Sequence, residues 1–555
     1  MTPTRHALNR VPSWLWLLLL LSLWLAGLGL APLIDVDEGA FSEASREMLV
    51  SGDWGHTTLH GADRFDKPIL IYWLQATSMA VFGVNEFAAR LPSALAALMW
   101  CLAAWRFAQG WLGAQAERTV VAIVATSLGV MLIGRAATAD ALLNALMCWA
   151  CLDLWRHLES REKAPLRRAF FWMGLGLLTK GPVACLVPGM AVVLYLVTSG
   201  QWRRLREVLG DPVAWAIVLL TAVPWYAYAL HRHGMAFIDG FILQHNVNRF
   251  MQAKEGHGGS PFYTLLVAPL LLLPWTPLLV SVGLRLKRAW RTPASRFLLC
   301  WSGFALLFFS LSNTKLPHYL LYGLTPLMLL CGQALSEPRS RKAGLALGLA
   351  LAICQLLLFG LLSWSQQAAN WLAQRTADPL YHTLLSSAAP GPAWWWLALF
   401  GALWLLVWCW PKAGGATMAD RAVAGALLGA FWVVLAVLPW WAETLQSPVR
   451  DLAHQARATG QPVVQWHTRQ PSFAFYLGAP TPSGGPSAPG LALARKDRLP
   501  ADAAVRIVAE DRGFVLVTPT AQAQDLAPSA PTLAPATEPA LAPAPTPTSA
   551  PAPQP

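Results

Sequence analysis

Long runs of apolar residues alternate with short polar breaks over the first 441 positions of the chain. A helix needs roughly 20 mostly apolar residues to cross the hydrocarbon core of a membrane. By this measure the pattern predicts about thirteen membrane-spanning helices, near residues 13–31, 89–108, 118–134, 138–155, 168–180, 183–198, 213–230, 262–284, 296–311, 317–335, 343–363, 393–410 and 419–441. We therefore expect an all-α polytopic membrane domain over residues 1–441. The first run follows Arg5 and Arg10, as a signal peptide would, but we interpret it as an uncleaved anchor because it is long enough to span.

Lys and Arg collect in every second break between the apolar runs. If the N-terminus lies in the cytoplasm, the cytoplasmic breaks hold these cations, namely Arg156, Arg161, Lys163, Arg167, Arg168, Arg203, Arg204, Arg206, Arg285, Lys287, Arg288, Arg291, Arg296, Arg339, Arg341, Lys342, Lys412 and Arg421. Cytoplasmic loops of membrane proteins are enriched in Lys and Arg. The pattern therefore predicts a multi-pass protein whose C-terminus lies outside the cytoplasm.

Two regions outside the apolar runs have their own patterns. The first outer loop, residues 32–88, holds two stretches with amphipathic spacing, which we expect to lie along the outer membrane surface as helices. Residues 442–518 combine a helical pattern near 447–458 with strand-like stretches at 463–466, 473–476, 505–508 and 514–517, which predicts a small periplasmic α/β domain. Residues 519–555 are rich in Ala and Pro and are expected to be disordered.

Composition supports the membrane interpretation and excludes some other classes. Charged residues make up 13% of the 555 residues, whereas soluble proteins carry about 25%. The net charge of +12 does not indicate nucleic-acid binding, because the cations lie in short breaks between apolar runs. Cys148 and Cys151 form a CxxC pair, but they lie within an apolar run, so we interpret them as packing residues rather than a metal or redox site.

Candidate chemistry gathers in the segments expected on the outer side. Ionisable residues near a membrane core are costly and therefore indicate function. The outer segments contain Asp35, Asp37, Glu38, Asp66, Lys67, Asp140, Lys180, His245, Arg249, His257, Lys315, His318 and Tyr319. A transporter or flippase of lipid-linked sugars is the alternative interpretation, but transport would place polar residues near the midplane. A scaffold without catalysis does not explain the acidic cluster at 35–38.

Several motifs resemble one family. The stretches DVDEGAFSEASREMLVSGDW (35–54), FDKPILIYW (65–73), NEFAARLPSAL (85–95), GRAATADALL (134–143), GLLTKGPVA (176–184), QHNVNRF (244–250) and SNTKLPHYLL (312–321) resemble the bacterial aminoarabinose transferases and protein O-mannosyltransferases. The resemblance covers roughly residues 14–335, and PSFAFYLG (471–478) matches loosely. It implies an inverting glycosyltransferase of the C-type fold in the bacterial inner membrane, with its active site facing the periplasm. The donor would be a sugar on polyprenyl (undecaprenyl) phosphate, and the acceptor lipid A, a glycan or a protein.

The resemblance also implies roles for single residues. Asp37 would be the catalytic acid that activates or orients the acceptor, and Asp140, in the pattern that begins at Arg135, would support it. The residues implied to contact the donor phosphate or its surroundings are Lys67, Lys180, Arg249, Lys315 and Tyr319. Asp35 and Glu38 would assist on the acceptor side. Asp66 and His257 would hold a divalent metal ion, for which Zn, Mg and Mn are all open.

Simpler interpretations stay open for some of these residues. Either Asp37 or Glu38 could merely cap a helix N-terminus, and Lys180 and Lys315 could be interfacial residues that extend toward water. His257 could be solvated and Tyr319 an interfacial aromatic. The aminoarabinose transferases usually continue Asp-Glu with Thr-Arg-Tyr, whereas this chain has Gly39-Ala40-Phe41, which leaves the donor sugar and the acceptor open.

Overall fold

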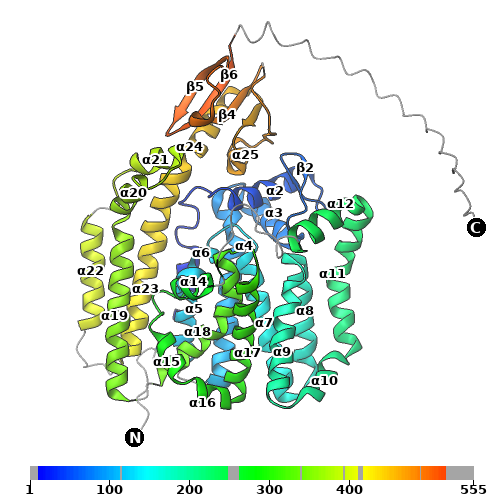
Figure 1. Cartoon of the computed structure of the whole chain (residues 1–555), viewed down its shortest axis with the longest axis vertical. Helices are drawn as coiled ribbons and strands as arrows, with labels where there is room; N and C mark the ends of the chain where they lie inside the picture. The colour runs from blue at the N-terminus through cyan, green and yellow to red at the C-terminus, as the bar shows by residue number, and fades with distance from the viewer. Residues whose placement is uncertain are drawn as a thin grey trace, which may run out of the picture.

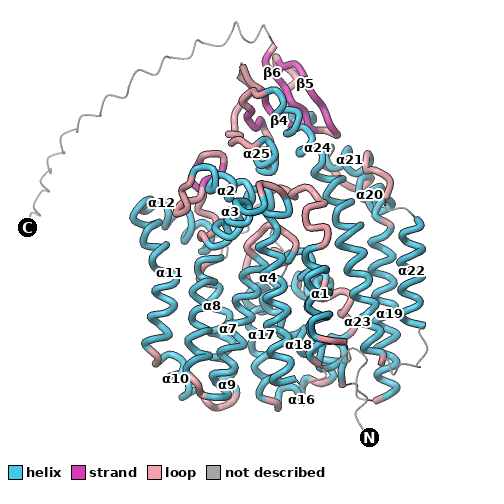
Figure 2. Tube along the Cα trace, turned by 180° about the vertical axis from the view of Figure 1, so that it is seen from behind, coloured by secondary structure: helices cyan, strands magenta, loops and turns pink. Residues whose placement is uncertain are grey.

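The structure is a computed structural model that describes residues 11–112, 116–247, 260, 262–337, 340–391, 394–409, 417–487 and 489–520. It consists of a bundle of roughly parallel helices with a small sheet at one end (Figure 1). A tube view from behind shows the strands gathered at that same end (Figure 2). The predicted mostly helical fold with a small sheet region near the C-terminus is confirmed.

The bundle begins with α1 and with two helices, α2 and α3, that lie across its upper end. The helices of the bundle up to residue 336 are α1 (Ser13–Leu25), α2 (Asp37–Ser51), α3 (Leu70–Phe82), α4 (Glu86–Phe107), α5 (Glu117–Thr126), α6 (Leu128–Gly134), α7 (Asp140–Ser160), α8 (Lys163–Lys180), α9 (Val183–Thr198), α10 (Leu205–Leu209), α11 (Pro212–His233), α12 (Met235–Phe237), α14 (Tyr263–Leu271), α15 (Leu278–Leu284), α16 (Leu286–Arg291), α17 (Pro293–Leu311) and α18 (Leu321–Ser336). Shorter π- and 3₁₀-helical turns are η2 (Ala108–Leu112), η3 (Trp202–Arg204), η4 (Ile238–Val247) and η5 (Pro317–Leu320).

The last third of the chain completes the bundle and builds the outer domain. Its elements are α19 (Arg341–Ser363), α20 (Ser365–Ala373), α21 (Pro379–Ser386), α22 (Trp394–Cys409), α23 (Met418–Trp432), η7 (Val433–Val437), α24 (Leu438–Thr459), β3 (Val463–Trp466), α25 (Pro471–Leu477), β4 (Leu491–Arg495), η8 (Lys496–Arg498), β5 (Val505–Asp511) and β6 (Phe514–Pro519). One helical segment runs from Met418 to Thr459, so the boundary predicted at residue 441 falls inside a continuous helix.

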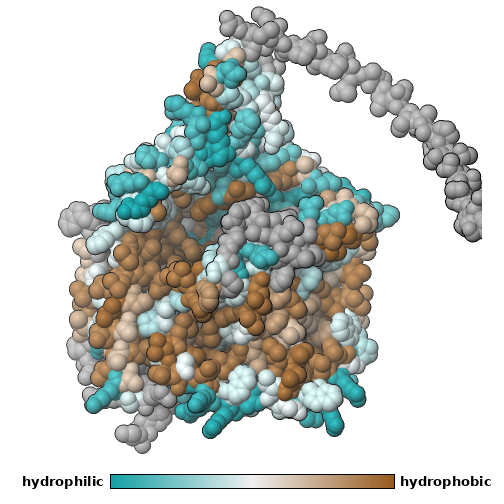
Figure 3. All heavy atoms as spheres, in the orientation of Figure 1, coloured by the Kyte–Doolittle hydropathy of each residue, from teal (hydrophilic) through white to brown (hydrophobic). Residues whose placement is uncertain are grey.

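Every predicted apolar run contains helix, but fewer helices of the described chain than the predicted thirteen are long and apolar enough to span a membrane. Six helical segments of the described chain are long and apolar enough to cross a membrane, or seven if the bent pair of α5 and α6 counts as one span. Figure 3 shows a broad hydrophobic band across the visible face of the bundle and polar residues at both of its ends. The protein is therefore a multi-pass membrane protein, and the number of thirteen spans stays a prediction.

Two broken helices meet inside the bundle. The helix over 117–134 bends by 65° after Thr126, and the run 262–284 is interrupted by Pro274, which cannot donate a backbone hydrogen bond. The amide of Leu128 donates to the carbonyl of Leu273 at 2.8 Å, and the indole of Trp275 donates to the hydroxyl of Thr126 at 2.9 Å. Irregular backbone at membrane depth is tolerated when protein groups satisfy it in this way. The break in turn directs α6 toward the loop that carries Arg135.

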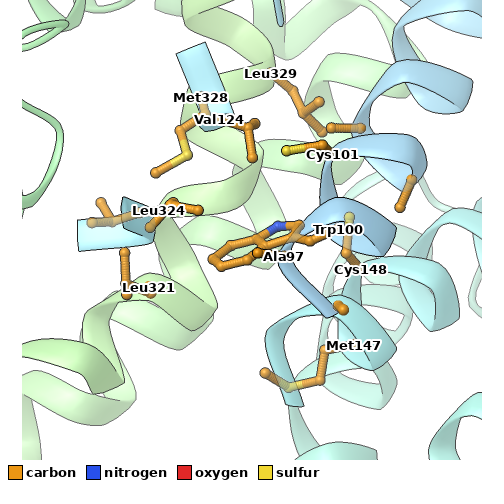
Figure 4. Close-up of a cluster of buried hydrophobic side chains, with 14 of the residues drawn as sticks. Ala97, Trp100, Cys101, Val124, Met147, Cys148, Leu321, Leu324, Met328 and Leu329 are labelled. Carbon is orange, nitrogen blue, oxygen red and sulfur yellow. The ribbon is translucent and has the colours of Figure 1, made fainter. Parts of the chain in front are cut away.

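The core of the bundle is formed mainly by α4, α5, α7 and α18. Figure 4 shows Trp100 packed among small and aliphatic side chains from these helices, with Cys101 and Cys148 beside it. Cys148 and Cys151 are both buried and free. Both lie among the apolar side chains of the core, where packing residues are expected.

The outer domain contains a four-stranded sheet with the strand order β3-β4-β6-β5. β3 and β4 are parallel, and the remaining pairs are antiparallel. Three of the predicted strand stretches are strands, but the prediction for 473–476 is wrong because Pro471–Leu477 is the helix α25. Pro471 at its first turn and Gly478, with φ of 80°, at its C-cap are the signals of a short helix. The aromatic residues between them favoured a strand by propensity alone.

Candidate active site

A cavity of about 370 Å³ lies where α2, the loop before α7 and α24 meet. Five of the predicted site residues line it, namely Asp35, Asp37, Glu38, Arg135 and Asp140, and His318 joins them. Val434, Leu438, Pro439, Trp441 and Ala442 form its apolar side. Residues as far apart in the sequence as Gly27 and Ala442 are thus brought to one cavity.

Asp37 begins α2 and is exposed toward this cavity. The free N–H groups and the dipole at a helix N-terminus favour a carboxylate at this position. Burial lowers the pKa of Arg64, but Tyr72 above all, then Asp66 and, least, Asp37, raise it above its ordinary value. The electrostatic influence of Asp37 thus reaches the loop that precedes α3.

Glu38 is buried and is held by an ion pair. Both of its carboxylate oxygens accept from Arg90, at 2.8 Å each. The same oxygens accept from the backbone amides of Ile34 at 2.9 Å and Ala137 at 2.7 Å. Burial raises the pKa of Glu38, but the charge and the hydrogen bonds of Arg90 outweigh it and lower that pKa. Glu38 therefore connects α2, α4 and the loop before α7, and so holds the walls of the cavity.

Asp35 connects the cavity to the outer domain. Its carboxylate accepts from the backbone amide of Ser472 at 2.9 Å and from the hydroxyl of the same residue. A Cβ atom at Gly39 would lie 2.0 Å from Asp35 Oδ1 and 2.5 Å from the amide nitrogen of Ser472. The glycine that replaces the usual threonine after Asp-Glu is thus what lets α2 approach α25 this closely.

Asp140 is the centre of a second group of contacts beside the cavity. Lys180 Nζ donates to Asp140 Oδ1 at 2.5 Å, and the hydroxyl of Tyr322 donates to the same oxygen at 3.1 Å. The ammonium group of Lys180 also lies 4.9 Å from the centre of the Tyr319 ring, a cation–π distance. His318 Nε2 lies 3.7 Å from Asp140 Oδ1. The predicted acid and two predicted donor-binding residues therefore form one cluster, at the first turn of α7 and the last turn of α8.

Arg135 and Lys315 are largely engaged with backbone carbonyls. Arg135 donates to the carbonyls of Leu23 and Trp24 at 3.0 Å each and of Ala26 at 2.7 Å, so it caps the end of α1. Lys315 Nζ donates to the carbonyl of Ser310 at the end of α17. These bonds give Arg135 a structural role at the cavity wall.

Lys67 and Asp66 lie away from this cavity, on the loop between β2 (Ala62–Asp63) and α3. The carboxylate of Asp66 is paired with Arg64 at 2.9 Å, and Lys67 Nζ donates to the carbonyl of Asp66 at 2.9 Å. Asp66 also lines a second cavity of about 510 Å³. Arg249 and His257 lie outside the described residues. A metal ion held by Asp66 and His257 thus stays a prediction.

Three residues of the site were not identified from the sequence. Arg90 belongs to the NEFAARLPSAL motif, but nothing in the motif says that it pairs with Glu38. Tyr322 follows Tyr319 by three positions, a spacing that places both side chains on one helix face, and the two rings stack at 6.0 Å. Ser472 lies in the loosely matching stretch of the outer domain, and no feature of the sequence indicates that it contacts Asp35.

Comparisons with known proteins agree with the geometry. The family model described as dolichyl-phosphate-mannose-protein mannosyltransferase matches residues 66–228. An undecaprenyl phosphate-alpha-4-amino-4-deoxy-L-arabinose arabinosyl transferase of Pseudomonas paraeruginosa is 32% identical over 448 residues, which are 78% of this chain and 76% of that protein. The protein of the same name from Pseudomonas aeruginosa (strain LESB58) is 32% identical, over 73% of this chain and 71% of its own length.

A solved structure has the same fold. The crystal structure of ArnT from Cupriavidus metallidurans, bound to undecaprenyl phosphate, superimposes with a TM-score of 0.77. The match covers 91% of this chain and 97% of that one, at 22% sequence identity. The expected C-type fold is therefore confirmed over the matched 91% of this chain.

Proposed function

Because the chain belongs to the family of undecaprenyl phosphate-aminoarabinose arabinosyl transferases, it is a membrane glycosyltransferase with a polyprenyl-phosphate sugar donor, and we propose that Asp37 is its catalytic acid. The proposed donor is 4-amino-4-deoxy-L-arabinose on undecaprenyl phosphate, and the proposed acceptor is lipid A. One observation carries the assignment of Asp37. Of the three acids at 35–38, Asp35 is bound to Ser472 and Glu38 to Arg90, whereas Asp37 is exposed to the cavity.

Asp37 would act on the acceptor hydroxyl. A carboxylate within hydrogen-bond reach of that hydroxyl can orient it and accept its proton while the oxygen attacks the anomeric carbon. Inversion requires the attack to come from the face opposite the departing phosphate. The cavity volume of about 370 Å³ suffices for a sugar between Asp37 and the group around Asp140.

The cluster around Asp140 would act on the donor. The phosphate gains negative charge as the sugar departs, and a preorganised cation in a poorly solvated site stabilises that charge strongly. Lys180 is held in one position by Asp140 and by the Tyr319 and Tyr322 rings. Asp140 would thus be a positioning residue for Lys180. Lys67, Arg249 and Lys315 would add positive charge for the donor phosphate, Lys67 from the loop before α3, and a divalent ion on Asp66 and His257, where bound, would add more.

We assign the periplasmic side to the end of the bundle that carries α2 and the outer domain. The cationic segments at α10 and α16 lie at the opposite end (Figure 1). Cations at one end support a cytoplasmic location for that end.

The test compares sugar transfer by the wild type, Asp37→Asn and Asp502→Asn in proteoliposomes that contain the radiolabelled aminoarabinose donor and lipid A. Asp502 is an exposed acid of the outer domain and serves as the control. Removing a general base lowers kcat by about 10²- to 10⁴-fold, so Asp37→Asn should fall by that factor while Asp502→Asn matches the wild type. Transfer by Asp37→Asn at the wild-type rate contradicts the role of Asp37. A parallel assay replaces the donor with a hexose on undecaprenyl phosphate, and transfer of the hexose but not of aminoarabinose contradicts the proposed sugar only.

A further inference from the structure

The loop over residues 52–65 packs closely against the last turns of α11. The indole of Trp225 donates to the carbonyl of Gly55 at 3.1 Å, and Arg232 pairs with Asp53 at 2.7 Å. A Cβ atom at Gly55 would lie 2.6 Å from the Tyr228 ring, so the backbone and the helix are in direct contact. This part of the first loop has a defined position relative to α11, and it includes the hairpin of β1 (Thr58–Leu59) and β2.

Two histidines and an aspartate meet at this contact. His56 Nε2 lies 3.0 Å from Asp63 Oδ1, and His233 Nδ1 lies 3.3 Å from Asp63 Oδ2. One ligand atom from each residue lies within 4.8 Å of the other two. The imidazoles are 9% and 11% exposed, so both histidines are largely enclosed, while Asp63 is open to solvent at 53%. The three residues come from the loop, from β2 and from the end of α11.

This set of atoms has the chemistry of a zinc site. Zinc takes imidazole nitrogen and carboxylate oxygen at about 2.0–2.2 Å in a tetrahedron, which separates the ligand atoms by about 3.3 Å. The two separations from Asp63, 3.0 and 3.3 Å, are close to this value. A metal binds the neutral form of an imidazole through a ring nitrogen, and His56 Nε2 and His233 Nδ1 are the ring nitrogens that face Asp63. The exposed side of Asp63 leaves room for a water as the fourth ligand.

A neighbouring cluster of similar composition differs in its hydrogen bonds. Glu43, Glu47 and His60 also approach one another. However, Arg46 binds both oxygens of Glu43, at 2.7 and 2.8 Å. Glu47 accepts from the hydroxyl of Thr58 at 2.5 Å and from the amide of His60 at 2.7 Å. The carboxylates of this second cluster are thus occupied by donors, whereas the partners of the Asp63 carboxylate within the described residues are His56 and His233, which can themselves ligate a metal.

We propose that His56, Asp63 and His233 bind a zinc ion, with water as the fourth ligand, and that this ion fastens the first outer loop to α11. The site is separate from the predicted pair of Asp66 and His257. Asp63 precedes Asp66 by three residues and Lys67 by four, so the ion would also fix the start of the FDKP segment. The proposal does not depend on which sugar is transferred.

The test measures zinc in the full-length protein in detergent, after chelation and reconstitution with Zn²⁺. The variants are His233→Ala and His56→Asn, and the control is His231→Ala, an exposed histidine two residues earlier on the same helix. Asp66→Asn reports separately on the other predicted pair. Zinc content is read by mass spectrometry, ligand geometry by the visible absorption of the Co²⁺-substituted protein, and folding by size-exclusion chromatography.

We expect His233→Ala and His56→Asn each to lose about one equivalent of zinc per chain and to lose the rise in melting temperature that zinc gives the wild type. His231→Ala and Asp66→Asn should keep that equivalent. The proposal is overturned if the wild type takes up no zinc, if both site variants keep as much as the wild type, or if only Asp66→Asn loses it. If one site variant fails to fold, the other decides by the same criterion.

Discussion

Replacing Glu38 with Gln removes the negative charge from a buried ion pair without changing the volume of the side chain. Each carboxylate oxygen of Glu38 accepts two hydrogen bonds: Oε1 from Arg90 and Ala137, and Oε2 from Arg90 and Ile34. Whichever oxygen becomes the amide NH₂ group, that group faces two N–H donors. The variant therefore loses two hydrogen bonds and leaves the Arg90 guanidinium buried without an anion.

Breaking a buried pair by removing one partner costs about 3–5 kcal/mol. We expect the free energy of unfolding of Glu38→Gln to fall by this amount, measured by denaturant titration in mixed micelles with tryptophan fluorescence as the signal. Glu443→Gln is the control, because Glu443 pairs with Arg450 but its side chain is 42% exposed. An exposed pair contributes about 1 kcal/mol or less.

A double-mutant cycle separates the pair from its surroundings. If Glu38 and Arg90 stabilise the protein through each other, the loss in Glu38→Gln/Arg90→Gln is smaller than the sum of the two single losses. Additive losses, or equal losses in Glu38→Gln and Glu443→Gln, would refute the conclusion that this pair holds the cavity walls.

Two further predictions concern single residues of the site. Lys180→Gln should lower kcat/KM for the donor by about 10²- to 10³-fold, the usual loss when one preorganised group that stabilises charge is removed. Lys163→Gln, at the exposed start of the same helix, should match the wild type in the same transfer assay. Equal effects of the two substitutions would contradict the role of Lys180. Burial raises the pKa of Asp35 to about 7. The folded state therefore retains a proton that the unfolded state releases near pH 4. The stability that depends on this proton is lost as the pH rises from about 4 through about 7. Melting curves at pH 5 and pH 8 should therefore differ less for Asp35→Asn than for the wild type, and an unchanged difference would contradict this assignment.

The sequence predicted the parts of this protein that repeat or that carry a motif. Apolar runs give helices almost regardless of their neighbours, because backbone groups in a membrane must bond within the helix. The acids and cations of the outer segments stood out because charge near a membrane is costly. Their grouping around Asp37 and Asp140 followed from the family resemblance and not from spacing.

What the sequence could not predict depends on distant partners. Glu38 and Asp37 are adjacent and chemically alike, and only the position of Arg90 on α4 makes one structural and leaves the other exposed. β4 (Leu491–Arg495) was not predicted because all of its residues are buried, so it has no alternation of apolar and polar positions. The helix α25 was predicted as a strand because its aromatic residues outweighed its terminal Pro and Gly.

The apolar side of the cavity comes from residues 434–442, in the last helical segment of the bundle. This placement has a consequence for biogenesis. A nascent chain carries Asp37 and Asp140 long before its final membrane helix leaves the ribosome, yet the cavity around them closes only when that helix has been inserted. Chains that stop before residue 434 would therefore hold every predicted catalytic residue and still lack one side of the cavity. Sugar transfer would thus begin only after synthesis has passed this last helical segment.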